Sequence, residues 1–117
     1  MDNKPTYYVI IPANVRYDKE LKDKSKILFG EIVTLSIKTG YCFANDKYFA
    51  DLFETTERTI RELIKELKEK GYVSVEYIYK ENTKDIKRRL LKPVGMEEFF
   101  RRVWKKSSEG YGRNLPI

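Results

Sequence analysis

The sequence predicts an α+β domain with a helical core, a β-hairpin and a C-terminal amphipathic helix. The pattern of apolar residues along the chain supports this in two ways. Between residues 23 and 70 they recur at helical spacing, whereas residues 72–93 form two β-prone segments around a polar turn. A chain of 117 residues is most simply one domain, long enough to bury a core.

The N-terminal part predicts an extended segment followed by a helix. The stretch "TYYVIIPANV" is rich in Tyr, Val and Ile and stops at Pro12, which indicates a short opening strand or an extended arm. A helical region begins at Leu21, and its stronger part runs from about Asp23 to Ile37. Gly30 inside this helix should cost up to about 1 kcal/mol relative to Ala. We therefore expect close helix packing at Gly30.

Two further helices are predicted, each after a capping residue. In "YCFANDKYFADLF" an N-cap at Asn45 or Asp46 begins a helix that ends at about Phe53. The next helix covers about residues 57–70, and the hydroxyl of Thr56 can accept from the free amides of its first turn.

A β-hairpin is predicted directly after these helices. Gly71 stands where the left-handed residue that ends a helix belongs. The segments "YVSVEYIY" and "IKRRLLKP" then flank the polar turn "KENTKD".

The chain after the hairpin predicts one more helix. We expect residues 1–92 to form one domain, 93–106 a C-terminal amphipathic helix, and 107–117, of linker composition, a tail or linker. The apolar residues of this helix fall at helical spacing: Met96, Phe99, Phe100, Val103 and Trp104. Such a stripe packs either on its own domain or on a second copy. For a homodimer, the candidate interface is Met96, Phe99, Val103 and Trp104.

Composition excludes several classes of function. Cys42 is the only cysteine and there is no histidine, which removes internal disulfides, the usual zinc sites and histidine acid–base catalysis. Cys42 itself is expected to be a small buried apolar residue. Glutamates in the helix at 57–70 alternate with Lys and Arg, which is typical of an exposed, ion-paired face. We predict no enzymatic activity, no metal, no cofactor and no small-molecule ligand.

The sequence also predicts a cytoplasmic protein with no membrane partner. No uninterrupted apolar run approaches the roughly 20 residues of a membrane helix. The N-terminus has Asp2 and only a short apolar stretch, unlike a secretory signal.

The charge of the chain is unevenly distributed. It has 24 basic and 18 acidic residues, a net charge of +6. Residues 44–70 hold six basic and seven acidic residues (net −1), 71–92 six and three (net +3), and 93–117 five and three (net +2). A basic protein of this size favours a polyanion as its partner.

The order helix, tight turn, helix, hairpin has a specific pattern within it. Ala50 is small where one helix must approach the next, and Ile60 and Leu63 are apolar where the second helix faces the core. The stretch "KYFADLFETTERTIRELIKELKEKGYV" resembles the helix-turn-helix of winged-helix DNA-binding domains. With "YYVIIPANVRYD" and "KILFGEIVTLS", the match over about residues 6–92 more narrowly resembles the N-terminal domains of phage and plasmid replication initiators of Gram-positive bacteria.

The sequence departs from that family in the turn, where Glu54 stands at a position usually held by Gly. If the backbone there is left-handed, a non-glycine residue is uncommon and somewhat strained.

The resemblance implies binding to double-stranded DNA through the second helix and the hairpin wing. With its apolar face in the core, the outward residues of the helix and turn are Thr55, Thr56, Arg58, Thr59, Arg61, Glu62 and Lys65. Arg58 and Arg61 can form paired hydrogen bonds with guanine, Glu62 suits a cytosine amino group or an ion pair, and the threonines suit phosphate. The wing residues expected along a neighbouring groove or backbone are Lys84, Lys87, Arg88 and Arg89.

Other interpretations of the same residues stay open. Exposed arginines also occur on solvated helices, and basic hairpin residues also prevent unwanted strand pairing. The same fold could serve a transcriptional regulator, or a protein-interaction module in replisome assembly, which the near-neutral helix favours. A natural chain that continues past Ile117 would favour the initiator, and one that ends there would favour the regulator.

Overall fold

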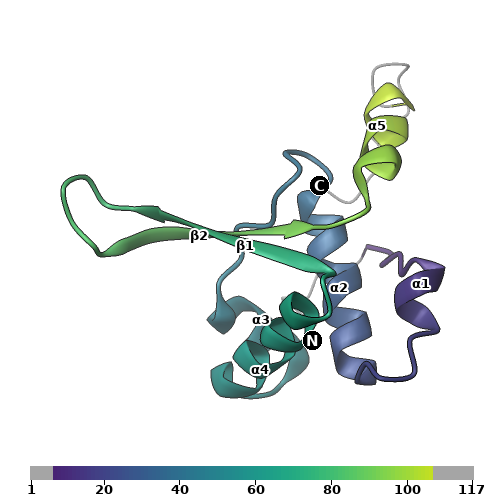
Figure 1. Cartoon of the computed structure of the whole chain (residues 1–117), viewed down its shortest axis with the longest axis horizontal. Coiled ribbons are helices and arrows are strands. Elements are labelled where there is room, and N and C mark those ends of the chain that lie inside the picture. Colours follow the sequence, from purple (N-terminus) through teal and green to yellow (C-terminus); the bar gives the residue numbers. More distant parts are fainter. Residues whose placement is uncertain (1–6, 107–117) are drawn as a thin grey trace.

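A computed structural model describes residues 7–106 (Figure 1). The elements are α1 (Ala13–Arg16), α2 (Asp23–Ser36), α3 (Asp46–Phe53), α4 (Glu57–Glu69), β1 (Val73–Tyr79), β2 (Ile86–Pro93) and α5 (Glu97–Lys106). The predicted α+β class, with a helical core, a hairpin wing and a C-terminal helix, is confirmed. The predicted tail at 107–117 lies outside the described residues.

The chain before α2 is an extended arm followed by a single helical turn. Residues 7–12 belong to no strand of the described chain, so the extended arm is the correct one of the two alternatives. The short helix α1 was not predicted. Its Val15 is fully buried, and this contact with the core explains why so short a helix holds its place.

Gly30 of α2 is packed against the arm. A Cβ atom at Gly30 would lie 2.1 Å from Cγ1 of Val9 and 3.1 Å from Cγ1 of Ile11. Beside it, the Tyr7 hydroxyl donates to Oε2 of Glu31 at 2.7 Å, and burial raises the pKa of that carboxyl. The prediction of close packing was right, but the partner is an extended segment and not a helix.

The helices of the central motif begin and end at predicted residues. The Asn45 side chain accepts from the Tyr48 amide at 2.8 Å, and the Thr56 hydroxyl accepts from the Thr59 amide at 3.1 Å. These bonds satisfy amides that have no partner inside their own helix. Gly71 follows α4 with φ of 82°, in the left-handed region where glycine is favoured.

The turn between α3 and α4 is left-handed although its residue is not glycine. Glu54 has φ of 55° and ψ of 49°. The next amide, of Thr55, donates to the Ala50 carbonyl at 2.9 Å and closes the end of α3. Glu54 therefore has the left-handed backbone expected to be strained for a residue other than glycine, and the turn closes with this residue in place.

The apolar face of α4 lies at the centre of the core. Its buried residues are those predicted: Ile60, Leu63, Ile64 and Leu67. They pack where α4 contacts α2, α3 and β1. Burial of each such side chain contributes about 1.5–3 kcal/mol, so this face fixes how α4 is rotated about its axis.

The hairpin is anchored at its base and projects at its outer end. Val73 of β1 stands opposite Pro93 of β2, and the pairing becomes irregular only towards the turn. On the other edge of β2, the amides of Cys42 and Leu91 each donate to the other residue's carbonyl, at 2.8 and 2.9 Å. Cys42 is buried as predicted, and burial raises its thiol pKa to about 11. The outer part of the hairpin extends away from the helices as the wing (Figure 1).

Much of the C-terminal stripe packs on the domain's own core. Met96 and Phe100 are buried in the same cluster as the apolar face of α4. The half-buried members are Phe99 and Val103. The Trp104 indole N–H donates to the Ile37 carbonyl and its ring stacks on Phe100, but the residue stays 44% exposed. Trp104 is therefore the main part of the stripe left for a partner.

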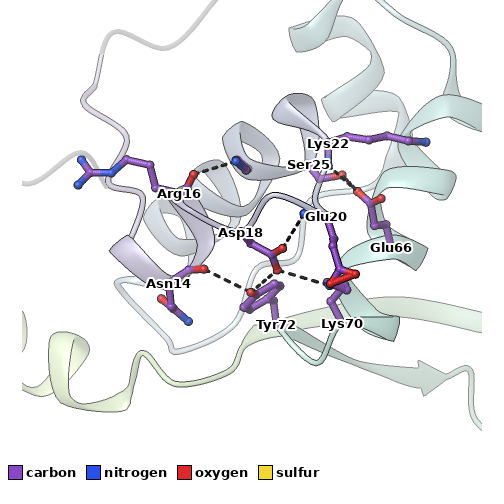
Figure 2. Close-up of polar contacts among 10 residues, drawn as sticks. Asn14, Arg16, Asp18, Glu20, Lys22, Ser25, Glu66, Lys70 and Tyr72 are labelled. Carbon is purple, nitrogen blue, oxygen red and sulfur yellow. Dashed lines mark hydrogen bonds and ion pairs between the residues drawn. The ribbon is translucent and has the colours of Figure 1, made fainter.

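A group of polar contacts ties the C-terminal end of α4 to the loop before α2 and to the first turn of α2 (Figure 2). The Tyr72 hydroxyl donates to Asp18 at 2.6 Å, and Nζ of Lys70 lies 3.6 Å from the same carboxylate. The hydrogen bond from Tyr72 is the main cause that lowers the pKa of Asp18. One turn earlier, Glu66 accepts from the Ser25 hydroxyl at 2.6 Å. These contacts hold the C-terminal end of α4 and leave its N-terminal end uncovered.

Replacing Leu63 tests the assignment of the buried face. Leu63 is 3% exposed, so Leu63→Ala should leave a cavity and lower the free energy of unfolding. The expected loss is roughly 2–5 kcal/mol. Lys65→Ala, on the exposed side of the same helix, should change it by less than about 0.5 kcal/mol. Denaturant unfolding measures both, and equal stabilities for the two variants would show that the face is assigned wrongly.

Replacing Gly30 tests the packing of the arm. In a free helix Gly30→Ala should stabilise by up to about 1 kcal/mol, but crowding against Val9 should cost about 1–3 kcal/mol. We expect a net loss of up to about 2 kcal/mol in unfolding free energy. In a Val9→Ala background, where the contacts of 3.1 Å to Ile11 and 3.3 Å to the Ile10 carbonyl oxygen remain, the same substitution should cost less. Stabilisation by Gly30→Ala alone would mean that the arm does not pack there.

Candidate nucleic-acid interface

The first turns of α4 carry, on one exposed surface, most of the DNA-contacting side chains predicted for this helix and the turn before it. We call it the recognition surface, and it consists of Thr56, Arg58, Arg61, Glu62 and Lys65. Thr55 and Thr59 are half-buried. The Thr56 hydroxyl donates to that of Thr59 at 3.0 Å, so these threonines also shape the start of the helix.

Cations of the recognition surface lie close to carboxylates on their own helix. Nε of Arg58 is 3.4 Å from Oε1 of Glu62, and Nζ of Lys65 is 3.9 Å from Oε1 of Glu69. All four side chains are more than half exposed. Exposed pairs of this kind contribute about 0–1 kcal/mol. Each cation can therefore exchange its carboxylate for another anion at little cost.

Asp46, the first residue of α3, brings together an arginine of α4 and an arginine of β2. Its Oδ1 accepts from Nη1 of Arg89 at 2.6 Å, and its Oδ2 lies 3.7 Å from Nη1 of Arg61. Nη2 of Arg89 also donates to the Ala44 carbonyl at 3.0 Å, and its side chain is only 17% exposed. Arg89 thus joins the base of the wing to α3. The sequence could have indicated that Arg89 points inward, because it shares a strand face with Leu91, which is buried.

The other predicted wing residues are exposed, unlike Arg89. Lys84 lies in the turn, and Lys87 lies where the strand pairing is irregular. The Arg88 guanidinium sits 4.9 Å from the centre of the Phe43 ring. Arg88 and Arg89, as neighbours in a strand, point to opposite faces. An open pocket of about 300 Å³ between the wing base and the start of α3 is lined in part by Phe43, Lys87 and Arg88.

The wing also carries exposed aromatic side chains that were not among the predicted site residues. Tyr77 and Tyr79 are 46% and 53% exposed, and their ring centres are 6.5 Å apart. Tyr77 stands opposite Arg89, whose guanidinium points towards α3. Residues that stand directly opposite each other in paired strands share a face, so Tyr77 lies on the same face of the hairpin as Arg89. The sequence could have indicated that Tyr77 and Tyr79 share a face, because every second residue of a strand points to the same side.

Comparison with known proteins agrees with this geometry. A family model described as a helix-turn-helix domain matches residues 19–73. No match was found among curated proteins or solved structures. Within residues 7–106, no helix combines the length and apolar character needed to cross a membrane.

The matched region contains α2, α3, the left-handed turn and α4, and it ends where β1 begins. The hairpin that follows gives the wing of a winged helix. Residues 19–73 therefore match a helix-turn-helix domain, and the structure extends this region by a wing and a C-terminal helix.

Proposed function

We propose that this domain binds double-stranded DNA sequence-specifically, with the N-terminal half of α4 in the major groove. The observation that carries the proposal is the exposure of Arg58, Arg61 and Lys65 on a helix whose opposite face is buried. A major groove admits an α-helix, and side chains near the helix N-terminus reach the base edges. Because these side chains are already exposed, α4 can enter the groove without any rearrangement of the core.

Roles within the interface follow from chemistry and position. Arg58 and Arg61 offer paired donors to guanine, and Glu62 offers an acceptor to a cytosine amino group. The exposed cations of the wing, Lys84, Lys87 and Arg88, neutralise phosphates and supply the salt-dependent part of the affinity. We assign Arg89 a supporting role, because its charge is already compensated by Asp46.

The finer proposal is that the domain recognises the replication origin for a phage or plasmid initiator. It rests on the resemblance of the arm, α2 and the central motif to such domains. A transcriptional regulator of the same fold is the alternative. A protein-interaction module in replisome assembly is a further alternative, favoured by the near-neutral charge of α4, and it predicts no preference among duplexes.

A homodimer would let the domain engage two half-sites, as many helix-turn-helix proteins do. We propose that any such pairing uses the exposed end of the stripe, at Trp104, with Phe99 and Val103 beside it. Met96 supports the interface only from inside, since it is 6% exposed. Sedimentation should then show Trp104→Glu as a monomer where the parent is a dimer. Equal masses for the two folded proteins would remove the stripe from the interface.

Binding measurements separate base recognition from phosphate contact. First, the preferred site is selected from a pool of random duplexes. Arg61→Ala should then weaken binding to that site by about 1–3 kcal/mol and relax the choice of base at one position. Lys87→Ala should instead weaken all duplexes about equally and reduce the slope of affinity against salt by about 1.

The control is Lys19→Ala, in the loop beside the C-terminal end of α4. Lys19 is exposed but lies away from the recognition surface, so both affinity and base preference should stay unchanged. If Arg58→Ala and Arg61→Ala bind every duplex as the parent does, α4 is only a solvated helix. The protein-interaction module would then be the better proposal.

A further inference from the structure

The carboxylate of Asp46 has one fixed partner and one exchangeable partner. Its contact with Arg89 is short, at 2.6 Å, and both side chains are 17% exposed. The Ala44 carbonyl holds the same guanidinium from a second side. By contrast, Arg61 is 59% exposed and lies 3.7 Å from the carboxylate, beyond ordinary hydrogen-bonding distance. The first contact is structural, and the second can be released.

This arrangement differs from the other pairs around the recognition surface. Arg58 and Glu62 lie one turn apart on α4 and move together with it, and both are mostly exposed. Asp46 lies on another helix and is anchored by the wing. It therefore supplies a fixed reference point outside α4 that orients the Arg61 side chain.

We propose that Asp46 is a positioning residue that determines the base specificity of DNA recognition by Arg61. The inference rests on the proposed function. In the free protein the carboxylate holds Arg61 at the edge of the recognition surface. On DNA it competes with the phosphates for the same guanidinium, and its negative charge repels them. Arg61 is transferred to DNA most readily where a guanine offers two acceptors in the plane of the guanidinium.

The magnitudes allow such a competition. A paired contact between arginine and guanine discriminates against a wrong base by about 5- to 150-fold. A loose ion pair such as that of Arg61 with Asp46, whose side chains are 59% and 17% exposed, corresponds to about a two- to five-fold effect. The attraction of the Asp46 carboxylate for Arg61 is therefore strong enough to disfavour binding to random sequence. It is too weak to prevent Arg61 from binding the preferred guanine.

The test compares Asp46→Asn with the parent on the selected duplex, on duplexes with single base-pair changes, and on random duplexes. Asp46→Asn should bind random duplexes more tightly. Its preference for the base read by Arg61 should fall by about two- to five-fold. At base positions that Arg61 does not read, Asp46→Asn should leave the preference unchanged. A purely structural role of Asp46 would instead lower the preference at those positions as well.

The matched control is Asp51→Asn, which removes the same charge from the same helix. Asp51 forms an ion pair with Lys47, one turn earlier on the same helix, at 3.0 Å, and both side chains are about 70% exposed. This variant should leave the base preference unchanged. A loss of preference equal to that of Asp46→Asn would overturn the proposal, because it would reduce the effect to net charge.

Loss of the Arg89 contact could destabilise the wing in Asp46→Asn, so unfolding is measured alongside binding. If that variant does not fold, Asp46→Asn combined with Arg89→Gln leaves a neutral pair and no unpaired buried charge. The expected loss of preference is the same.

Three results would overturn the inference alone: an unchanged preference in a folded Asp46 variant, an equal loss at base positions that Arg61 does not read, or an equal loss in Asp51→Asn. A parent that prefers no duplex at all would overturn the proposed function, and the inference with it.

Discussion

Burial of one face of α4 is the constraint on which the rest of the structure depends. Ile60, Leu63, Ile64 and Leu67 are each at most 6% exposed. Because side chains repeat every 3.6 residues around a helix, burying these positions turns Arg58, Arg61 and Lys65 to the solvent. The core that receives this face also takes Leu91 from the base of β2 and Phe100 from α5. The recognition surface, the wing and the final helix are thus positioned by one cluster of apolar contacts.

The two ends of α4 are held differently, and this difference fits a role in binding. Tyr72 and Lys70 tie the C-terminal end to the loop before α2, and Glu66 ties it to Ser25 in the first turn of α2. At the N-terminal end, a capping threonine and exposed ion pairs leave the polar groups accessible. The near neutrality of the helix therefore need not oppose DNA binding. Weak pairs can be exchanged for base contacts, while the exposed cations of the wing attract the phosphates.

Sequence patterns predicted the local features of this fold well. Period and caps located α3 and α4, and alternation with a polar turn located the hairpin, because each signal acts within a few residues. Features that depend on distant partners were missed. Gly30 suggested a helix as its neighbour, but the neighbour is the arm around Val9. The single turn of α1 carries too short a pattern to recognise and is stabilised by the burial of Val15.

The candidate site shows the same division between local and distant information. The exposed side of α4 follows directly from its apolar face. The position of Arg89 does not, because a run of basic residues does not reveal which of them meets a carboxylate from another helix. Strand alternation separates Arg88 from Arg89 once the register is known. The choice between replication and transcription depends on which DNA is bound, and no side-chain contact within the domain encodes that choice.

The most direct measurement is an NMR titration of the ¹⁵N-labelled protein with the duplex that it selects from a random pool. If α4 enters the groove beside the wing, the amides that shift should be those of residues 55–62 and of the wing around residues 84–88. The amide signals of the loop at 17–22 and of residues 66–72 should not shift, because these two segments face away from the DNA. Shifts centred on α5, or on the loop at 17–22, would contradict recognition by α4.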